Sequence, residues 1–105
     1  YREISQGAAS VDIAQTLLYQ CVSYCEMQKY RNAALCNAEA LALYKKISNG
    51  TDSTDIAKTL IVRGDYYTTT GRESRGRDEY RRGLKILMKL EPDNPLVREM
   101  LFILS

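Results

Sequence analysis

Apolar residues along the chain recur three and four positions apart, which is the spacing of one face of an α-helix. Leu17, Cys21 and Tyr24 follow this spacing, and no segment shows the strict alternation of apolar and polar residues that marks a strand. Short turn segments interrupt the helical pattern. The predicted fold class is therefore all-α, with helices over Val11 to Gln28, Tyr30 to Ser48, Thr54 to Thr70, Ser74 to Leu90 and Pro95 to Leu104.

One segment of the sequence returns almost unchanged further along. The residues from Ser10 to Leu17, Ser-Val-Asp-Ile-Ala-Gln-Thr-Leu, reappear from Ser53 to Leu60 as Ser-Thr-Asp-Ile-Ala-Lys-Thr-Leu. Position 17 thus corresponds to position 60, a displacement of 43 positions, and a fainter third copy runs from Asn94 to Leu101. Internal periods of about 20 to 50 residues are typical of solenoids, propellers and repeat arrays. Without strands a propeller is excluded, and helical repeats remain.

Capping residues divide this repeating pattern into units. Ser10, Ser53 and Asn94 occupy equivalent places in the three copies, and all three are residue types that cap helix N-termini well. Gly7 and Gly50 are expected just beyond helix ends, where a left-handed backbone favours glycine. We interpret residues 1–105 as one domain, with the end of a preceding repeat in 1–9, repeats in 10–52 and 53–93, and the first helix of a third repeat in 94–105.

Each repeat is predicted to fold as a hairpin of two antiparallel helices, which needs small residues where the backbones approach closely. Three glycines in the second repeat take the places of larger residues in the first. A glycine inside a helix is less favourable than alanine by about 1 kcal/mol, so the second hairpin is expected to be the looser one. The predicted narrow points are Cys21, Ala33 and Ala40 in the first repeat and Gly64, Gly76 and Gly83 in the second.

The composition restricts the chemistry. The chain has no histidine, which removes the commonest general base and metal ligand, and we expect no enzyme and no cofactor. A net charge of +2 argues neither for nor against a polyanionic partner, and no apolar run approaches the roughly 18 residues of a membrane span. Three cysteines are an odd number, so a closed set of disulfides within one chain is impossible. A reducing compartment is expected, with a cytoplasmic localisation and no membrane partner.

Two of the cysteines, Cys21 and Cys25, lie four positions apart and therefore on one face of a helix. Such spacing suits a metal site, but zinc takes four ligands and Cys36 is the remaining thiol. We therefore interpret Cys21 as a small core residue and expect no metal. Cys25 is left as a candidate reactive thiol, for which the sequence shows no activating neighbour.

The alternation of small and large residues in paired helices resembles the tetratricopeptide repeat (TPR). The Asp-Ile-Ala-x-Thr-Leu opening and the long period resemble the long-linker variant typical of kinesin light chains. The chain departs from the family pattern where Gln20 and Arg63 replace leucine and Asn37 replaces an aromatic residue. The family-like positions are Leu17, Cys21, Tyr24, Leu60, Gly64 and Tyr67 in the first helices and Ala33, Ala40, Leu41, Gly76, Tyr80, Gly83 and Leu84 in the second.

This resemblance implies a right-handed superhelix, a TPR-like solenoid of antiparallel hairpins that serves as a protein-protein interaction scaffold. The first helices would line a concave face that binds a peptide or helix of a partner protein. The alternative is that this face packs against the rest of the parent protein. The residues expected on it are Gln15, Tyr19, Val22, Cys25, Glu26, Lys58, Val62, Asp65 and Thr69.

Two other regions suggest alternative roles. The helix from Arg72 to Lys89 is rich in basic residues, which suits an anionic partner or a solvated outer face. Nucleic acid is unlikely, because no aromatic residues interleave these charges. The exposed ends of the repeat array, Ile4 at one end and Leu101, Phe102 and Leu104 at the other, could instead support self-association as an assembly element.

Overall fold

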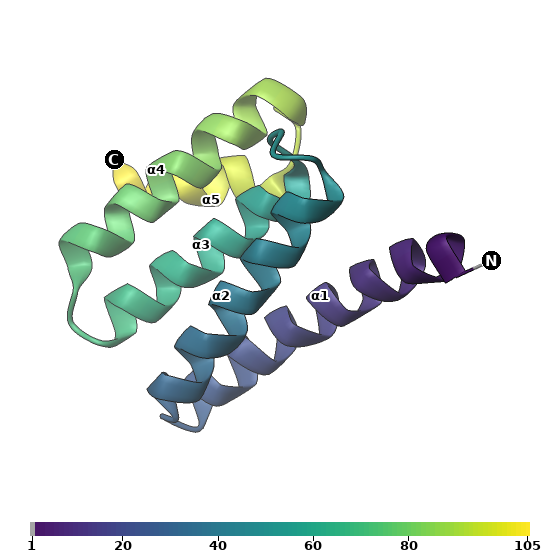
Figure 1. The fold of residues 1–105 in the computed structure, drawn as a ribbon. Coiled ribbons are helices and arrows are strands. Elements are labelled where there is room, and N and C mark those ends of the chain that lie inside the picture. The colour runs from purple at the N-terminus through teal and green to yellow at the C-terminus, as the bar shows by residue number, and fades with distance from the viewer. Residues whose placement is uncertain (1) are drawn as a thin grey trace. The chain divides into compact units, whose positions relative to one another are not determined.

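The computed structural model describes the backbone of residues 2–105 and the side chains of residues 10–105. Over this range the chain is all-helical, with no strand, as the apolar spacing predicted (Figure 1). The helices are α1 (Arg2–Glu26), α2 (Tyr30–Ile47), α3 (Thr54–Thr69), α4 (Glu73–Leu90) and α5 (Pro95–Leu104). Apart from the start of α1, the predicted ends lie within two residues of those observed.

The start of α1 was predicted wrongly. The helix runs without a break from Arg2, so Ser10 lies inside it and is not an N-cap, and Gly7 does not follow a helix end. The equivalent stretch before α3 is Thr51-Asp52, whereas here it is Ala8-Ala9. Alanine is the best helix former, and threonine and aspartate are poor ones, so the helix continues at the first site and stops at the second. Tyr1 and the side chains of residues 1–9 lie outside the described residues.

The other two predicted caps are confirmed. The Ser53 hydroxyl oxygen accepts a hydrogen bond from the Ile56 N–H at 3.1 Å. The Asn94 side-chain oxygen accepts one from the Leu96 N–H at 2.9 Å, and Pro95 follows in the first turn, where its missing N–H is not needed. The starts of α3 and α5 are therefore fixed locally by sequence.

The chain divides into two compact units, Tyr1–Thr51 and Asp52–Ser105, which we call unit 1 and unit 2. Unit 1 contains the α1–α2 hairpin, and unit 2 contains the α3–α4 hairpin with α5 packed against α4. The division falls next to the predicted repeat junction at residues 52 and 53. Gly50, just before it, has the expected left-handed backbone, with φ of 81°.

The turns inside the two hairpins share one geometry. Gln28 and Gly71 occupy equivalent positions, and both have a left-handed backbone, with φ of 61° and 85°. The N–H groups of the next residues, Lys29 and Arg72, each bond the carbonyl five residues earlier, at 2.8 and 2.7 Å. This is the Schellman motif, which satisfies carbonyls at a helix end. The internal repeat thus extends to the hydrogen bonds of the turns.

The narrow points of both hairpins lie where the sequence predicted them. In unit 1, Cys21, Ala33 and Ala40 are fully buried. In unit 2, a Cβ added at Gly64 would lie 2.7 Å from the Tyr80 ring, a distance that real side chains do not tolerate. The other two glycines, Gly76 and Gly83, are equally confined. That unit 2 is the looser hairpin stays a prediction.

Candidate functional site

The predicted partner-binding residues of α1 share one face of that helix. Gln15, Tyr19, Val22 and Glu26 follow one another at four, three and four positions, which places them along one stripe. All four are exposed, and Tyr19 is the most prominent, with 71% of its surface accessible. The fifth predicted residue, Cys25, is half-buried beside them. This face does not pack in the hairpin core and is available for contact.

The predicted residues of α3 likewise share a face. Lys58, Val62, Asp65 and Thr69 repeat the spacing of four, three and four. Val62 is half-buried, and the other three are exposed. The candidate residues thus form two separate groups, one along α1 in residues 15–26 and one along α3 in residues 58–69.

Asp65 is held in place, which its sequence position did not reveal. The Tyr80 hydroxyl on α4 donates a hydrogen bond to its carboxylate. Burial of the carboxyl group raises the pKa of Asp65, the bond from Tyr80 opposes this, and nearby Glu99 on α5 raises it further. Burial also raises the pKa of Tyr80 to about 12, and the Asp65 carboxylate adds to the effect. Although Asp65 is exposed as a residue, its carboxylate has a fixed direction toward α4.

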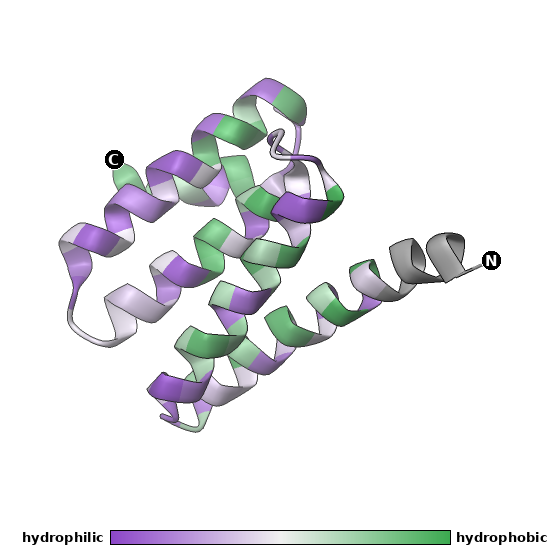
Figure 2. Ribbon diagram, in the orientation of Figure 1, coloured by the Kyte–Doolittle hydropathy of each residue, from purple (hydrophilic) through white to green (hydrophobic). Residues whose placement is uncertain are grey.

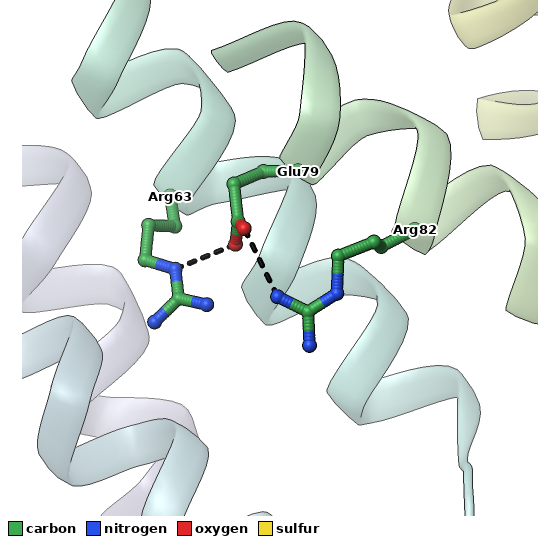
Figure 3. Close-up of polar contacts among 3 residues, drawn as sticks. All are labelled: Arg63, Glu79 and Arg82. Carbon is green, nitrogen blue, oxygen red and sulfur yellow. Dashed lines mark hydrogen bonds and ion pairs between the residues drawn. The ribbon is translucent and has the colours of Figure 1, made fainter. Parts of the chain in front are cut away.

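A second polar cluster joins α3 to α4 (Figure 3). The Glu79 carboxylate receives Arg63 through Nε at 2.6 Å and Arg82 through Nη1 at 3.1 Å. The side chain of Glu79 is only 10% exposed. A carboxylate so buried is unfavourable unless it is paired, and two guanidinium groups supply that pairing. The cluster explains why Arg63 can replace the leucine expected at its position.

The same two positions are also polar in unit 1. Gln20 is equivalent to Arg63, Cys36 is equivalent to Glu79, and the Cys36 thiol donates a weak hydrogen bond to the Gln20 side-chain oxygen at 3.9 Å. Sequence reasoning noted Gln20 and Arg63 only as departures from the family pattern. The signal that was missed is that both positions change together between the repeats. Gln20 and Cys36 are a neutral pair, whereas Arg63 and Glu79 carry opposite charges.

The cysteines of unit 1 show no metal site. Cys21 is fully buried, as expected for a core residue, and burial raises its pKa to about 12, with half-buried Cys25 beside it. The pKa of Cys36 is also raised by burial and by Glu39. No group of histidine, cysteine or acidic residues among residues 10–105 is arranged to hold a metal ion. A reactive role for Cys25 stays a prediction.

The basic residues of α4 are only partly engaged. Arg81 pairs with Asp78 at 3.1 Å, and Arg82 pairs with Glu79 at 3.1 Å. Arg75 lies over the ring of Tyr67, 5.8 Å from its centre. Figure 2 shows hydrophilic residues along much of α4, in contrast to the mostly hydrophobic α5. The outer side of α4 therefore remains strongly basic.

The end of α5 carries the exposed apolar surface predicted for self-association, with one correction. Phe102 is 82% exposed and Leu101 is 50% exposed. Leu104, however, is half-buried, and Ile103 is exposed in its place. The reason is the helical period: Leu104 falls on the face of α5 shared with buried Met100, four residues earlier. The predicted contact at Ile4 lies outside the described side chains.

No protein-family model matches the chain, and no curated protein sequence matches it. Among the described residues, none of the helices has the length and apolar character needed to cross a membrane. What can be inferred about function therefore comes from the internal repeat and from the surfaces of α1, α3, α4 and α5.

Proposed function

We propose that the chain is a segment of a TPR-like solenoid, a right-handed superhelix of the long-linker, kinesin-light-chain-like kind, that serves as a protein-protein interaction scaffold. Two features support this: the hairpin turns share one hydrogen-bond pattern, and small residues lie at equivalent narrow points. Both features belong to a repeated helical hairpin. Repeats of this kind stack into extended concave surfaces that bind other molecules.

The exposed face of α1 is the observation that carries the proposal. Tyr19 leaves 71% of its surface accessible on a rigid helix, with exposed Val22 three residues away. Tyrosine is enriched at protein interfaces because it combines a large apolar ring with a polar hydroxyl. On α3 the equivalent of Tyr19 is Val62, and the equivalent of Gln15 is Lys58. These faces therefore differ in chemistry while sharing a frame, which suits selection of a peptide or helix from a partner protein.

The proposed scaffold performs no reaction and uses no cofactor. The chain contains no histidine, and the pKa of its most buried thiol, Cys21, is raised away from the reactive range. The odd number of cysteines favours a reducing compartment, and the proposed localisation is the cytoplasm. Binding would rely on preformed helical surfaces, which lowers the conformational entropy lost on association.

Affinity capture from cell lysate with the full chain tests this function. Tyr19→Ala and Lys58→Glu should each reduce recovery of the proteins bound by the wild type, with the melting temperature unchanged. Leu35→Ala and Lys46→Glu are matched controls, because these residues are exposed on α2 and lie outside the candidate faces. Unchanged recovery with both site variants would show that the faces of α1 and α3 are not the binding site.

The exposed apolar end of α5 favours a second candidate function, self-association. Leu101 and Phe102 are equivalent to Leu60 and Ile61, which are buried in unit 2. Sedimentation equilibrium of the wild type should then show an oligomer that Leu101→Asp and Phe102→Asp dissociate. Leu35→Asp serves as a control for an added charge at another exposed leucine. A monomeric wild type at high concentration would exclude the assembly role.

A further inference from the structure

The outer side of α4 carries a stripe of three cations that α2 replaces by alanine. Arg77, Arg81 and Lys85 lie four residues apart and are all exposed. At the equivalent positions α2 has Ala34, Ala38 and Ala42, of which the last two are exposed and the first is half-buried. Figure 2 shows hydrophilic residues along much of α4. We call Arg77, Arg81 and Lys85 the basic stripe.

The fold does not require the basic stripe. The same repeat frame forms a hairpin in unit 1 with alanine at all three positions, and alanine is the better helix former. Of the three stripe residues, all within the described part of the chain, Arg81 alone has an ion pair, to Asp78, and both side chains are more than half exposed. Exposed pairs of this kind contribute little to stability. Neither packing nor pairing thus accounts for three cations in a row.

Neighbouring acidic groups neutralise the stripe only in part, since exposed Glu73 lies four residues before Arg77 and offsets one of its charges. Glu79, which lies between its first two members in the sequence, is withdrawn into the α3–α4 interface, where Arg63 and Arg82 surround it. Asp78 offsets one charge at Arg81. Exposed Arg75 and Lys89 add further positive charge to the same helix. The local field on the outer side of α4 is therefore positive, although the net charge of the whole chain is only +2.

The spacing of the stripe matches carboxylates on a protein segment. Four residues along a helix span about 6 Å. Carboxylates four residues apart on a partner helix have the same spacing, and those on alternate residues of an extended strand are about 6.6 Å apart. Nucleic acid would also match in charge, but single-stranded binding uses exposed aromatic rings for stacking. The aromatic residue of α4, Tyr80, is 5% exposed and turned toward α3.

We propose that the basic stripe of α4 is a second docking surface, which binds an acidic protein segment with carboxylates about 6 Å apart. This surface is distinct from the faces of α1 and α3. It depends on the α4 sequence and not on the superhelical arrangement or on the partner of those faces. The proposal therefore stands or falls separately from the scaffold function.

Fluorescence anisotropy of the full chain with a labelled probe peptide tests the proposal. The probe is a 16-residue alanine-based helical peptide with glutamate at every fourth position, and its matched control has glutamine at those positions. The decisive variant combines Arg77→Ala, Arg81→Ala and Lys85→Ala, which gives α4 the stripe of α2. Affinity should fall roughly tenfold, or about 1.4 kcal/mol, when three exposed charge pairs are lost together.

A second triple variant separates the stripe from overall charge. Lys29→Ala, Lys45→Ala and Lys46→Ala remove three exposed cations from unit 1, so both triple variants have a net charge of −1. The proposal expects this control to bind the probe within about twofold of wild type, with both variants retaining the helical circular dichroism spectrum. Binding of the glutamate probe should also weaken with added salt, since the contacts are exposed.

Several outcomes would overturn the proposal. An equal loss of affinity in the two triple variants would show that net charge alone drives binding. Tighter binding of a labelled 16-nucleotide single-stranded RNA than of the glutamate peptide, with loss in the stripe variant, would assign the surface to nucleic acid. No difference between the glutamate and glutamine peptides at low salt would leave no role for the stripe in binding acidic segments.

Discussion

In unit 2 the ring of Tyr80 lies against Gly64, whereas in unit 1 the same two repeat positions hold Asn37 and Cys21. Both arrangements are buried: Cys21 is fully covered, Asn37 is 1% exposed and Tyr80 is 5% exposed. From unit 1 to unit 2 the residue on the first helix becomes smaller, from Cys21 to Gly64, and the residue on the second helix becomes larger, from Asn37 to Tyr80. The two changes in side-chain volume compensate each other within the same hairpin. Close packing demands such paired changes, because a core tolerates neither voids nor overlaps.

The polar contacts of the two hairpins differ in the same paired way. Arg63 and Glu79 form an ion pair in unit 2, and their equivalents Gln20 and Cys36 form a weak neutral contact in unit 1. In unit 2 the third member, Arg82, completes the neutralisation of Glu79. The comparison teaches that the hairpin specifies which positions must match each other, while the chemistry of each match is free to change.

The largest expected effect comes from filling the space at Gly64. Its added Cβ would lie 2.7 Å from the Tyr80 ring and 2.9 Å from the Gly76 carbonyl oxygen. Gly64→Cys should therefore destabilise the protein by about 3 kcal/mol in urea unfolding followed by circular dichroism. Adding Tyr80→Asn, which completes the pair found in unit 1, should recover part of that loss. A double variant less stable than the sum of the single changes would contradict the matched-pair interpretation.

Breaking the charged cluster should have the next largest effect. Glu79→Gln leaves Arg63 and Arg82 beside a neutral group, and we expect a loss of about 2 kcal/mol, less than for a fully buried pair because Arg63 is 25% exposed. Asp78→Asn is the matched control on the exposed side of α4 and should cost less than about 0.5 kcal/mol. The Arg63→Gln/Glu79→Cys variant carries the unit 1 pair and should be more stable than Glu79→Gln. Equal losses for Glu79→Gln and Asp78→Asn would argue against the cluster.

Alkaline pH should lower the free energy of unfolding, from about pH 9 through Cys21 in unit 1 and from about pH 10 through Tyr80 in unit 2. Burial raises the pKa of Cys21 from 9.0 to about 12 in unit 1 and that of Tyr80 from 10.0 to about 12 in unit 2. The folded state holds these protons where the unfolded state releases them, so each contribution is fully present below the lower pKa and is lost as pH rises toward 12. The loss is at most about 1.4 kcal/mol per pH unit for each group.

Urea unfolding at pH 8, 9.5 and 10.5 measures these slopes. Cys21→Ala should reduce the decline that begins near pH 9, to which Cys36 also contributes, and Tyr80→Phe should remove the decline that begins near pH 10. Both single variants keep the rest of the chain unchanged, so each serves as the control for the other. Identical pH profiles in wild type and Cys21→Ala would mean that the buried thiol does not contribute.

The smallest expected effect concerns the turns. Gln28 adopts the left-handed backbone that its equivalent Gly71 adopts without a Cβ. Gln28→Gly should therefore stabilise the protein by about 0.5 to 1 kcal/mol, since relief of strain exceeds the added freedom of the unfolded chain. Lys29→Gly is the control, because its φ of −93° is accessible to any residue and glycine there should destabilise. A Gln28→Gly protein less stable than the wild type would show that the left-handed backbone at Gln28 is not strained.

Local signals in the sequence predicted much of the fold. Ser53 and Asn94 cap α3 and α5 as expected, and Gly64, Gly76 and Gly83 lie at narrow points. Ser10 misled because a capping residue acts only where the preceding chain leaves the helix, and Ala8-Ala9 let it continue. The N-cap at Ser10 was predicted from its equivalence to Ser53 alone, and the residues that precede each serine were not compared.

The candidate site was predictable only where it depends on one helix. The faces of α1 and α3 follow from helical spacing, and Tyr19 is exposed on the first of them, while its role in binding stays a prediction. The contacts of Glu79 with Arg63 and of Tyr80 with Asp65 cross between helices, over 16 and 15 positions of sequence. Their detection requires the register of α3 against α4, which periodicity within a single helix does not contain.

The buried thiol of Cys21 has a practical consequence. With a pKa of about 12, only on the order of one molecule in 10⁵ carries the thiolate at pH 7, and the sulfur has no solvent-accessible surface in the folded hairpin. All three cysteines of the chain lie in unit 1, and none lies in unit 2. The alkylation rate of Cys21 therefore measures how often the first hairpin opens, and mass spectrometry can follow it. The second hairpin has no cysteine, so it adds no alkylation signal.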